Sequence, residues 1–258
     1  MFISDPYFYL IAIPAVIIYG IGKGGLGGAV GDIVVPLMAL AISPAQAAAI
    51  LLPILCVMDY FAVKQHYKHA DWNELKHMLP WAIVGIIMAT ALMKYIPEAG
   101  LQILIGGISL GFVALYLFRA IKAKKPSQPR SPSVWCCLGG FASTAIHAGG
   151  GPVNIYLLPK KLDKVTLIAT MVVLFAIINF IKLIPYSWLG GFELTNIYTA
   201  IILMPLAPLG VKIGVWLLHR VSQTLVYRAC YLFLFISGLK LFTDGIENIQ
   251  PALIVLSQ

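Results

Sequence analysis

The sequence predicts an all-α polytopic membrane protein with two inverted repeats, each a glycine-broken, re-entrant helix region plus three transmembrane helices. Three observations predict this fold class: an apolar composition, six long apolar segments and two matching glycine-rich interruptions. Of the 258 residues, 60% are hydrophobic and 11% are charged, whereas soluble domains carry about 45–50% apolar and about 25% charged residues. Lipid is therefore the solvent for most of the chain, which excludes an ordinary cytosolic enzyme and a nucleic-acid-binding module.

Six apolar segments have the length of a transmembrane helix. Each approaches the ~20 residues that cross a ~30 Å hydrocarbon core, and none alternates as the strands of a membrane barrel do. We expect spans at about residues 45–63, 75–93 and 99–118 in the first half of the chain, and at about 165–188, 194–218 and 221–242 in the second half.

Two further apolar regions, residues 5–42 and 133–162, are interrupted by glycine. The arm before the first interruption, residues 5–19, would give only about 22 Å of helix at 1.5 Å per residue, which is too short to cross. A shift of 123 positions aligns Gly27-Gly28-Ala29-Val30 with Gly150-Gly151-Pro152-Val153, and Asp59 falls near Asn179. These matches predict an internal duplication, with repeats at 1–126 and 127–258 joined by a basic, Pro/Ser-rich linker.

The distribution of Lys and Arg decides between two topologies. If each broken region crosses once, the chain has eight spans and the basic residues divide nine against seven. If each is a re-entrant hairpin, they divide fourteen against two, with Lys23 and Lys182 left at membrane depth. Because cytoplasmic loops carry the Lys/Arg excess, the hairpins are favoured. Each half then has an odd number of spans, which inverts the repeats, and both termini lie outside the cytoplasm.

The glycine breaks are the candidate binding site. A helix that restarts inside the bilayer presents unpaired N–H donors and a partial positive charge, which suit a small anion. We expect the two restarting helices to meet near the membrane midplane. The glycines concerned are Gly24, Gly25, Gly27, Gly28, Gly149, Gly150 and Gly151.

Three charged residues of the first half lie in apolar surroundings. A lysine costs roughly 2.5–3.5 kcal/mol at a helix centre, so Lys23 needs a partner or a wet cavity. It is either a cationic contact for the anion or half of a structural pair with Asp32 or Asp59. The two acids either couple transport to protons or pair with lysine.

The second half supplies further polar candidates. Asn179 and Lys182 are three residues apart, which puts them on one helix face, although Lys182 could instead snorkel toward the interface. His147 and Asn154 flank the second glycine run and can donate hydrogen bonds to an oxyanion; the imidazole could equally bond a freed carbonyl.

Other readings of these residues fail. Gly20–Gly25 fits the dinucleotide pattern G-x-G-x-x-G but lacks the surrounding strand–helix–strand unit. The four cysteines lie in apolar stretches without CxxC spacing, and no metal-binding motif is present. We therefore expect no cofactor and no metal.

The duplicated motifs GxGKGGLGG…VVPL and GGGPVNIYLLP resemble those of the sulfite exporter TauE/SafE family, as does the pattern of Asn179, Lys182, Pro185-Tyr186 and Gly190. The resemblance covers nearly the whole chain. Lys23 and His147 stand beside the breaks where many members have other residues, so the substrate preference of this chain could differ.

The resemblance implies a secondary transporter of small sulfur-containing anions such as sulfite or sulfoacetate, working by alternating access in a bacterial inner membrane. An anion channel with the same site is the alternative. An intramembrane enzyme is less favoured, because the sequence shows no positioned nucleophile. The expected partners are the anion and the lipid bilayer, without nucleic acid; a homo-oligomer stays open.

Overall fold

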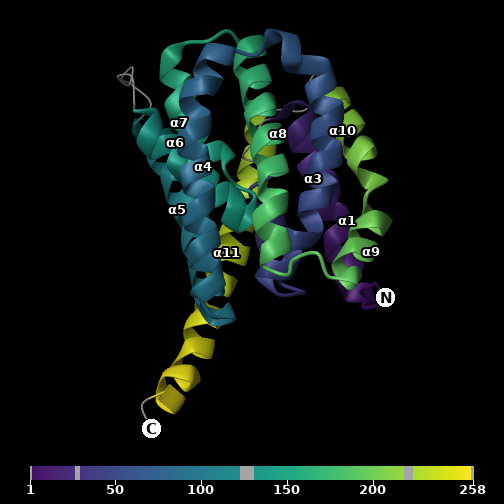
Figure 1. The fold of residues 1–258 in the computed structure, drawn as a ribbon, viewed down its shortest axis with the longest axis vertical. Helices are drawn as coiled ribbons and strands as arrows, with labels where there is room; N and C mark the ends of the chain where they lie inside the picture. The colour runs from purple at the N-terminus through teal and green to yellow at the C-terminus, as the bar shows by residue number, and fades with distance from the viewer. Residues whose placement is uncertain (1, 27–29, 123–130, 218–222, 257–258) are drawn as a thin grey trace.

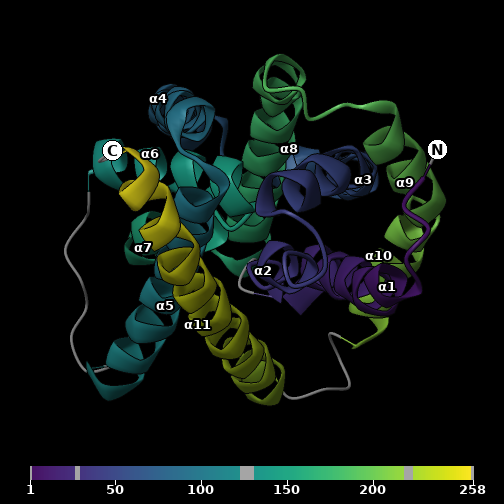
Figure 2. The ribbon, with the colours of Figure 1, turned by 90° about the horizontal axis from the view of Figure 1, so that it is seen from below.

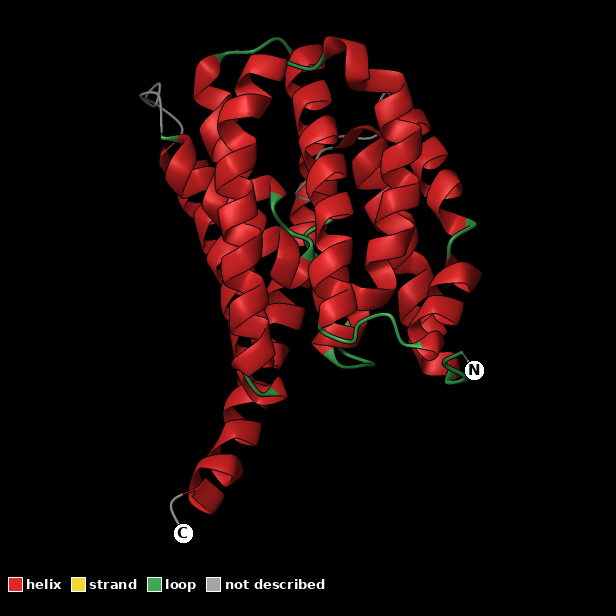
Figure 3. Cartoon of the chain, viewed as in Figure 1, coloured by secondary structure: helices red, strands yellow, loops and turns green. Residues whose placement is uncertain are grey.

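The computed structural model describes residues 2–26, 30–122, 131–217 and 223–256 (Figure 1). This part of the chain consists of helices and short connections without any strand, as Figure 3 shows. The prediction of an all-α protein is thereby confirmed. Non-helical backbone lies inside the bundle as well as at its two ends.

In the first half, the described residues form five α-helices. Several begin at a side chain that accepts backbone N–H bonds, as an N-cap does: Asp5 precedes α1, Ser43 precedes α3, and Asp71 precedes α4. The helices are α1 (Pro6–Ile21), which continues as the π-helical turn η1 (Gly22–Leu26), α2 (Val34–Met38), α3 (Pro44–His66), α4 (Trp72–Tyr95) and α5 (Glu98–Lys122).

Six α-helices lie in the described part of the second half. Asp163 caps α8, and hydrogen bonds from Thr166 hold the pKa of the Asp163 carboxyl below its usual value. The helices are α6 (Pro132–Ile146), α7 (Gly150–Leu157), α8 (Lys164–Trp188), α9 (Leu194–Leu203), α10 (Leu206–Leu217) and α11 (Gln223–Leu256); short 3₁₀ turns η3 (Tyr67–His69) and η4 (Leu158–Lys160) follow α3 and α7.

Five segments of the described chain are long and apolar enough to cross a membrane, and a bent pair makes a sixth. Helices α3, α4, α5 and α8 cover the spans expected at those positions. The span expected at 194–218 is instead two helices, α9 and α10, bent by 44°. Pro205 lies at the bend, and a proline removes a helix N–H and clashes with the preceding turn. The span expected at 221–242 falls mostly within α11; residues 221 and 222 lie outside the described part.

The first arm is longer than expected. The prediction that it ends near residue 19 and is too short to cross is wrong, since Pro6–Gly24 forms 19 residues of helix long enough for a membrane. Glycine costs only about 1 kcal/mol relative to alanine in a helix, and backbone groups in lipid need internal hydrogen bonds. The helix therefore continues through Gly20 and Gly22, finishing as a π-turn.

Each broken region returns to the end of the bundle from which it starts. The Ile3 N–H donates to Thr199 Oγ1 (3.1 Å), and the Gln46 amide donates to Asn196 (2.9 Å), so both ends of the first region lie beside α9. The second region returns to the opposite end, where Lys160 donates to Glu74 at the start of α4 (2.6 Å). Figure 1 shows these two ends at the bottom and the top of the bundle.

Close helix pairs join the two halves of the chain (Figure 2). α4 packs on α6, α1 on α10, α5 on α11 and α3 on α8. Glycines permit the contacts: a Cβ on Gly140 would strike the Ala82 carbonyl, and one on Gly20 would lie 2.8 Å from the Gly210 Cα. Small residues let backbones approach in lipid, where no hydrophobic force drives helices together.

Candidate functional site: polar side chains at the helix breaks

The second break is made by a residue in a left-handed conformation. His147 ends α6 with φ 54° and ψ 25°, a region that L-residues other than Asn, Asp and His rarely visit. Its N–H donates to the Ser143 carbonyl (3.1 Å), and helix α7 restarts at Gly150 after Gly149. Such a conformation persists only where the surroundings fix it.

Side chains from other helices supply hydrogen bonds to the carbonyl groups at this break. Tyr19 of α1 donates to the His147 carbonyl (2.9 Å), and Tyr186 of α8 donates to the Thr144 carbonyl (2.5 Å). Lys182 of α8 donates to the Ser143 carbonyl (2.7 Å). These bonds compensate for the helix hydrogen bonds lost inside the bilayer.

The His147 imidazole has a defined tautomer. Its Nε2 lies 2.9 Å from the Ala48 carbonyl, which only accepts, so Nε2 carries the proton. Its Nδ1 lies 2.8 Å from the Lys182 ammonium, which only donates, so Nδ1 is the bare acceptor. The imidazole is therefore neutral.

Lys182 is a fully buried lysine. Its side chain has 0% exposure and does not reach toward the membrane surface. The ammonium donates to the carbonyl and the hydroxyl of Ser143 (2.7 and 3.0 Å) and to His147. Within the described part of the chain, no carboxylate forms an ion pair with it. Its amino group is thus fully hydrogen-bonded, but none of these hydrogen-bond partners is a carboxylate.

The lysine of the first half, Lys23, differs from Lys182 because a carboxylate neutralises it. Lys23 of η1 forms an ion pair with Asp59 of α3, whose second oxygen accepts from the Asn179 amide of α8 (2.6 Å). Asp59 and Asn179, which the duplication aligns, thus meet where α3 packs on α8. Lys23 was predicted to contact the anion or to form a structural ion pair; in this conformation it forms the ion pair with Asp59.

The remaining predicted residues are more dispersed. Asp32 is buried in the turn before α2, and no hydrogen bond to its carboxyl is seen among the described residues. Asn154 lies half-buried on α7, and Gly24 and Gly25 lie in η1. Gly27 and Gly28 fall outside the described residues.

Glycine is required for packing at only one of two positions in the second run. A Cβ on Gly149 would lie 2.9 Å from both the Phe175 ring and Ser143, and would also strike the Gly139 carbonyl. A Cβ on Gly151 would meet only the Phe112 ring at 3.7 Å, an ordinary contact. The missing side chain at Gly151 therefore leaves space at the start of α7.

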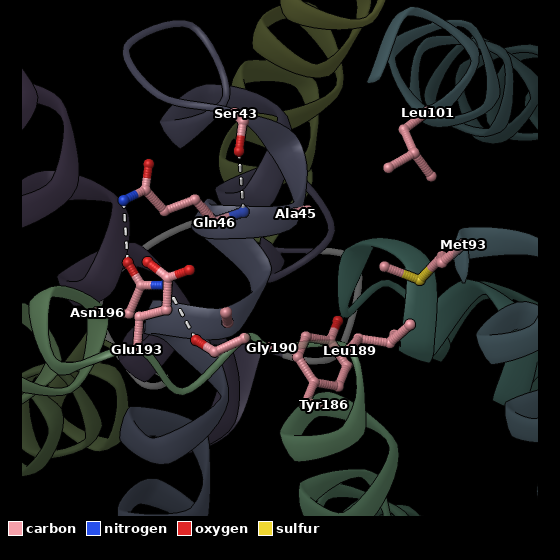
Figure 4. A pocket seen from close by; sticks show the side chains of 12 residues that line it. Ser43, Ala45, Gln46, Met93, Leu101, Tyr186, Leu189, Gly190, Glu193 and Asn196 are labelled. Carbon is pink, nitrogen blue, oxygen red and sulfur yellow. Dashed lines mark hydrogen bonds between the residues drawn. The ribbon is translucent and has the colours of Figure 1, made fainter. Parts of the chain in front are cut away.

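A pocket of about 360 Å³ opens at the lower end of the bundle (Figure 4). Gln46 and Asn196 bond each other at its side, and Glu193 lies beside them. Tyr186 lines the pocket while its ring stacks on His147, with centroids 5.8 Å apart. The pocket residues are Ser43, Ala45, Gln46, Ala49, Met93, Leu101, Tyr186, Leu189, Gly190, Gly191, Glu193 and Asn196.

Sequence reasoning missed three participants. Tyr19, Ser143 and Tyr186 form hydrogen bonds at the break with partners far along the chain; Tyr19 and His147, for example, are 128 positions apart. Spacing offered a signal for two of them, because Tyr19 stands one turn before Lys23 and Tyr186 one turn after Lys182. No spacing pattern in the sequence near Ser143 indicates its role.

The described part of the chain contains no group of three His, Cys, Asp or Glu residues that could hold a metal ion. Cys56, Cys136 and Cys137 are free thiols. The side chain of Cys230 lies outside the described part.

Comparison with known proteins supplies the family. No curated protein and no solved structure matches the chain. The sequence profile described as Sulfite exporter TauE/SafE matches residues 12–241, which include both breaks and both halves. This match and the apolar helices together identify a multi-pass membrane protein of a transporter family. The chain therefore belongs to the sulfite exporter TauE/SafE family, as its duplicated glycine motifs predicted.

Proposed function

We propose that this protein is a secondary carrier of a small sulfur-containing anion, sulfite or an organosulfonate such as sulfoacetate. The anion binds at the helix breaks, and alternating access moves it across a bacterial inner membrane. Both chain termini lie on the non-cytoplasmic face in this proposal, because the lysine-rich end of the bundle would face the cytoplasm.

The buried ammonium of Lys182 carries the proposal. A lysine inside a membrane costs roughly 2.5–3.5 kcal/mol even on the most lenient scale, and no carboxylate of the described residues forms an ion pair with this one. A bound anion would supply the missing negative charge. The neutral His147 leaves the local charge at +1, which suits a monoanion such as a sulfonate.

The start of α7 offers a second contact. The first N–H groups of a helix have no acceptor within the helix, and here they belong to Gly150 and Gly151. Because Gly151 has no packing reason to be glycine, its role in the proposal is to let an oxyanion approach the backbone. Asn154, half-buried one turn further on, would complete the contact.

The acids have separate roles. Asp59 is engaged by Lys23 and Asn179, so we assign it to the ion pair that holds the two halves together. Asp32 is buried without a hydrogen bond among the described residues, so it is our candidate for carrying a coupling proton.

The arrangement of helices supports inverted repeats. α1 packs on α10 of the other half, and α6 packs on α4 of the first half. The aligned helices α3 and α8 pack on each other, as do α5 and α11. Since the two broken regions also open toward opposite ends of the bundle, an approximate two-fold axis in the membrane plane would relate residues 1–126 to 127–258.

A thermal-shift screen of the purified protein tests the proposal. The screen compares sulfite, sulfoacetate, isethionate, taurine, thiosulfate and sulfate. We expect at least one sulfite or sulfonate to raise the melting temperature, and the Lys182→Met variant to lose that shift. Equal shifts in the variant and the parent would remove Lys182 from the site.

Flux through proteoliposomes separates a carrier from a channel. A carrier shows saturable, gradient-coupled uptake, whereas a channel binds its ion more weakly at several sites and carries ohmic current. Ohmic current from the reconstituted protein would contradict the carrier hypothesis and favour the channel hypothesis.

A further inference from the structure

The pocket at the lower end of the bundle stops short of Lys182, and a single aromatic side chain lies at the boundary. Tyr186 lines the pocket, yet only 2% of its surface is exposed. Its ring stacks on His147 at an interplanar angle of 20°, and His147 in turn bonds Lys182. Tyr186 therefore separates the pocket from the buried cation.

A hydrogen bond holds the ring in this position. The Tyr186 hydroxyl donates to the Thr144 carbonyl at 2.5 Å, so the side chain bridges α8 to the end of α6. Gly191 packs against Ala49 of α3 and donates its N–H to the Tyr186 carbonyl (2.9 Å). The turn after α8 thus closes over the same residue.

The helix that carries the ring has a weak point beside it. Pro185 lies inside α8, and a proline cannot make the helix hydrogen bond to the residue four positions earlier, here Ile181. Kinks in helices occur at such positions. Lys182 and Tyr186 are four residues apart and share a face of α8, so a bend at Pro185 would move the ring relative to the ammonium.

We propose that Tyr186 is the gate between the pocket and the central anion site, and that the pocket is the vestibule through which the anion leaves or enters at this end. The identity of the permeant anion rests on the proposed function. The gate itself is a matter of access and can be tested without any transport.

Cys56 is a natural reporter for this test. It lies on α3, seven residues after the pocket residue Ala49 and one turn before Asp59, whose carboxylate contacts Lys23 and Asn179. Replacing Cys136, Cys137 and Cys230 by serine leaves Cys56 as the only thiol. A membrane-impermeant methanethiosulfonate reagent is then applied to the face at which Ser43→Cys, in a cysteine-free chain, reacts.

Opening the gate should accelerate the modification of Cys56. If the open state is about 1–10% populated, Tyr186→Ala predicts a roughly 10- to 100-fold faster reaction. Tyr186→Phe keeps the ring and loses only one hydrogen bond, which predicts about a fivefold increase. Tyr198→Ala removes an exposed tyrosine of α9 on the same side and should leave the rate unchanged.

Unchanged rates in both Tyr186 variants, with melting temperatures like the parent, would overturn the gate, as would a parent in which Cys56 already reacts as fast as Ser43→Cys. Tyr186→Phe keeps the test decisive if Tyr186→Ala does not fold. Absence of any stabilising anion in the thermal-shift screen would instead count against the proposed substrate, and leaves these rates interpretable.

Discussion

The two helix breaks differ in how each accommodates a lysine in apolar surroundings. At the first break Lys23 is neutralised by Asp59. At the second break Lys182 is hydrogen-bonded by Ser143 and His147 but has no carboxylate partner in the described chain. The first arrangement is complete without a ligand, whereas the lysine of the second has no ion-pair partner among the described residues.

The difference separates a structural from a binding role for two lysines that look alike in the sequence. Both were candidates because each is a cation in an apolar segment. A lysine whose partner is supplied by the fold stabilises the fold, and removing one member leaves a buried charge. A lysine without such a partner is poised to bind an anion, so its removal should affect ligand affinity more than stability.

The largest expected effect is on stability, at the first break. Lys23→Met leaves Asp59 buried without its cation, which should lower the unfolding free energy by about 3–5 kcal/mol. The double variant Lys23→Met/Asp59→Asn removes both charges and should recover most of the loss. Denaturant unfolding in detergent measures both; equal stability of the single and double variants would contradict the pairing.

The next effect is on affinity, at the second break. Lys182→Met should weaken anion binding by roughly 10- to 150-fold, since a hydrogen bond to a charged group is worth about 1.5–3 kcal/mol. Its stability should change little, because relief of the buried charge offsets the hydrogen bonds lost at Ser143 and His147. Titration of the melting temperature with the best anion gives the affinity. Lys160→Met, which removes a lysine paired with Glu74 at the other end, is the matched control and should bind normally.

A third comparison lies within the glycine run itself. Gly151→Ala places a methyl group at the start of α7 and should weaken anion binding about tenfold, or about 1.4 kcal/mol, while the protein stays folded. Gly149→Ala clashes with Gly139 and Phe175 and should instead reduce the yield of folded protein. Wild-type affinity in Gly151→Ala would show that the anion does not approach this backbone.

The smallest effect concerns a contact between the breaks. Tyr19→Phe removes the hydroxyl that donates to the His147 carbonyl and should cost about 1 kcal/mol of stability, the usual value for one buried hydrogen bond. Tyr198→Phe, at an exposed tyrosine, serves as the reference. A Tyr19→Phe protein with the stability of this reference would mean that water satisfies the carbonyl.

Apolar length and glycine position predicted much of the fold. The helices at α3, α4, α5 and α8 follow from uninterrupted apolar runs, and the break before α7 from Gly149–Gly151. The bend at Pro205 and the continuation of α1 through Gly22 were missed, because the cost of a proline or glycine is decided by neighbouring helices. The ion pair and the long-range His147 bonds join residues from 35 to 128 positions apart, and a single sequence contains no record of such contacts.

The glycine crossings have a consequence for motion. α1 and α10 approach so closely at Gly20 and Gly210 that they cannot slide independently, and α4 and α6 are locked in the same way at Gly85 and Gly140. Each locked pair takes one helix from either side of the linker. Any rigid body that moves as a unit in this protein therefore contains helices from both sides of the linker, and the linker does not mark the boundary between moving bodies.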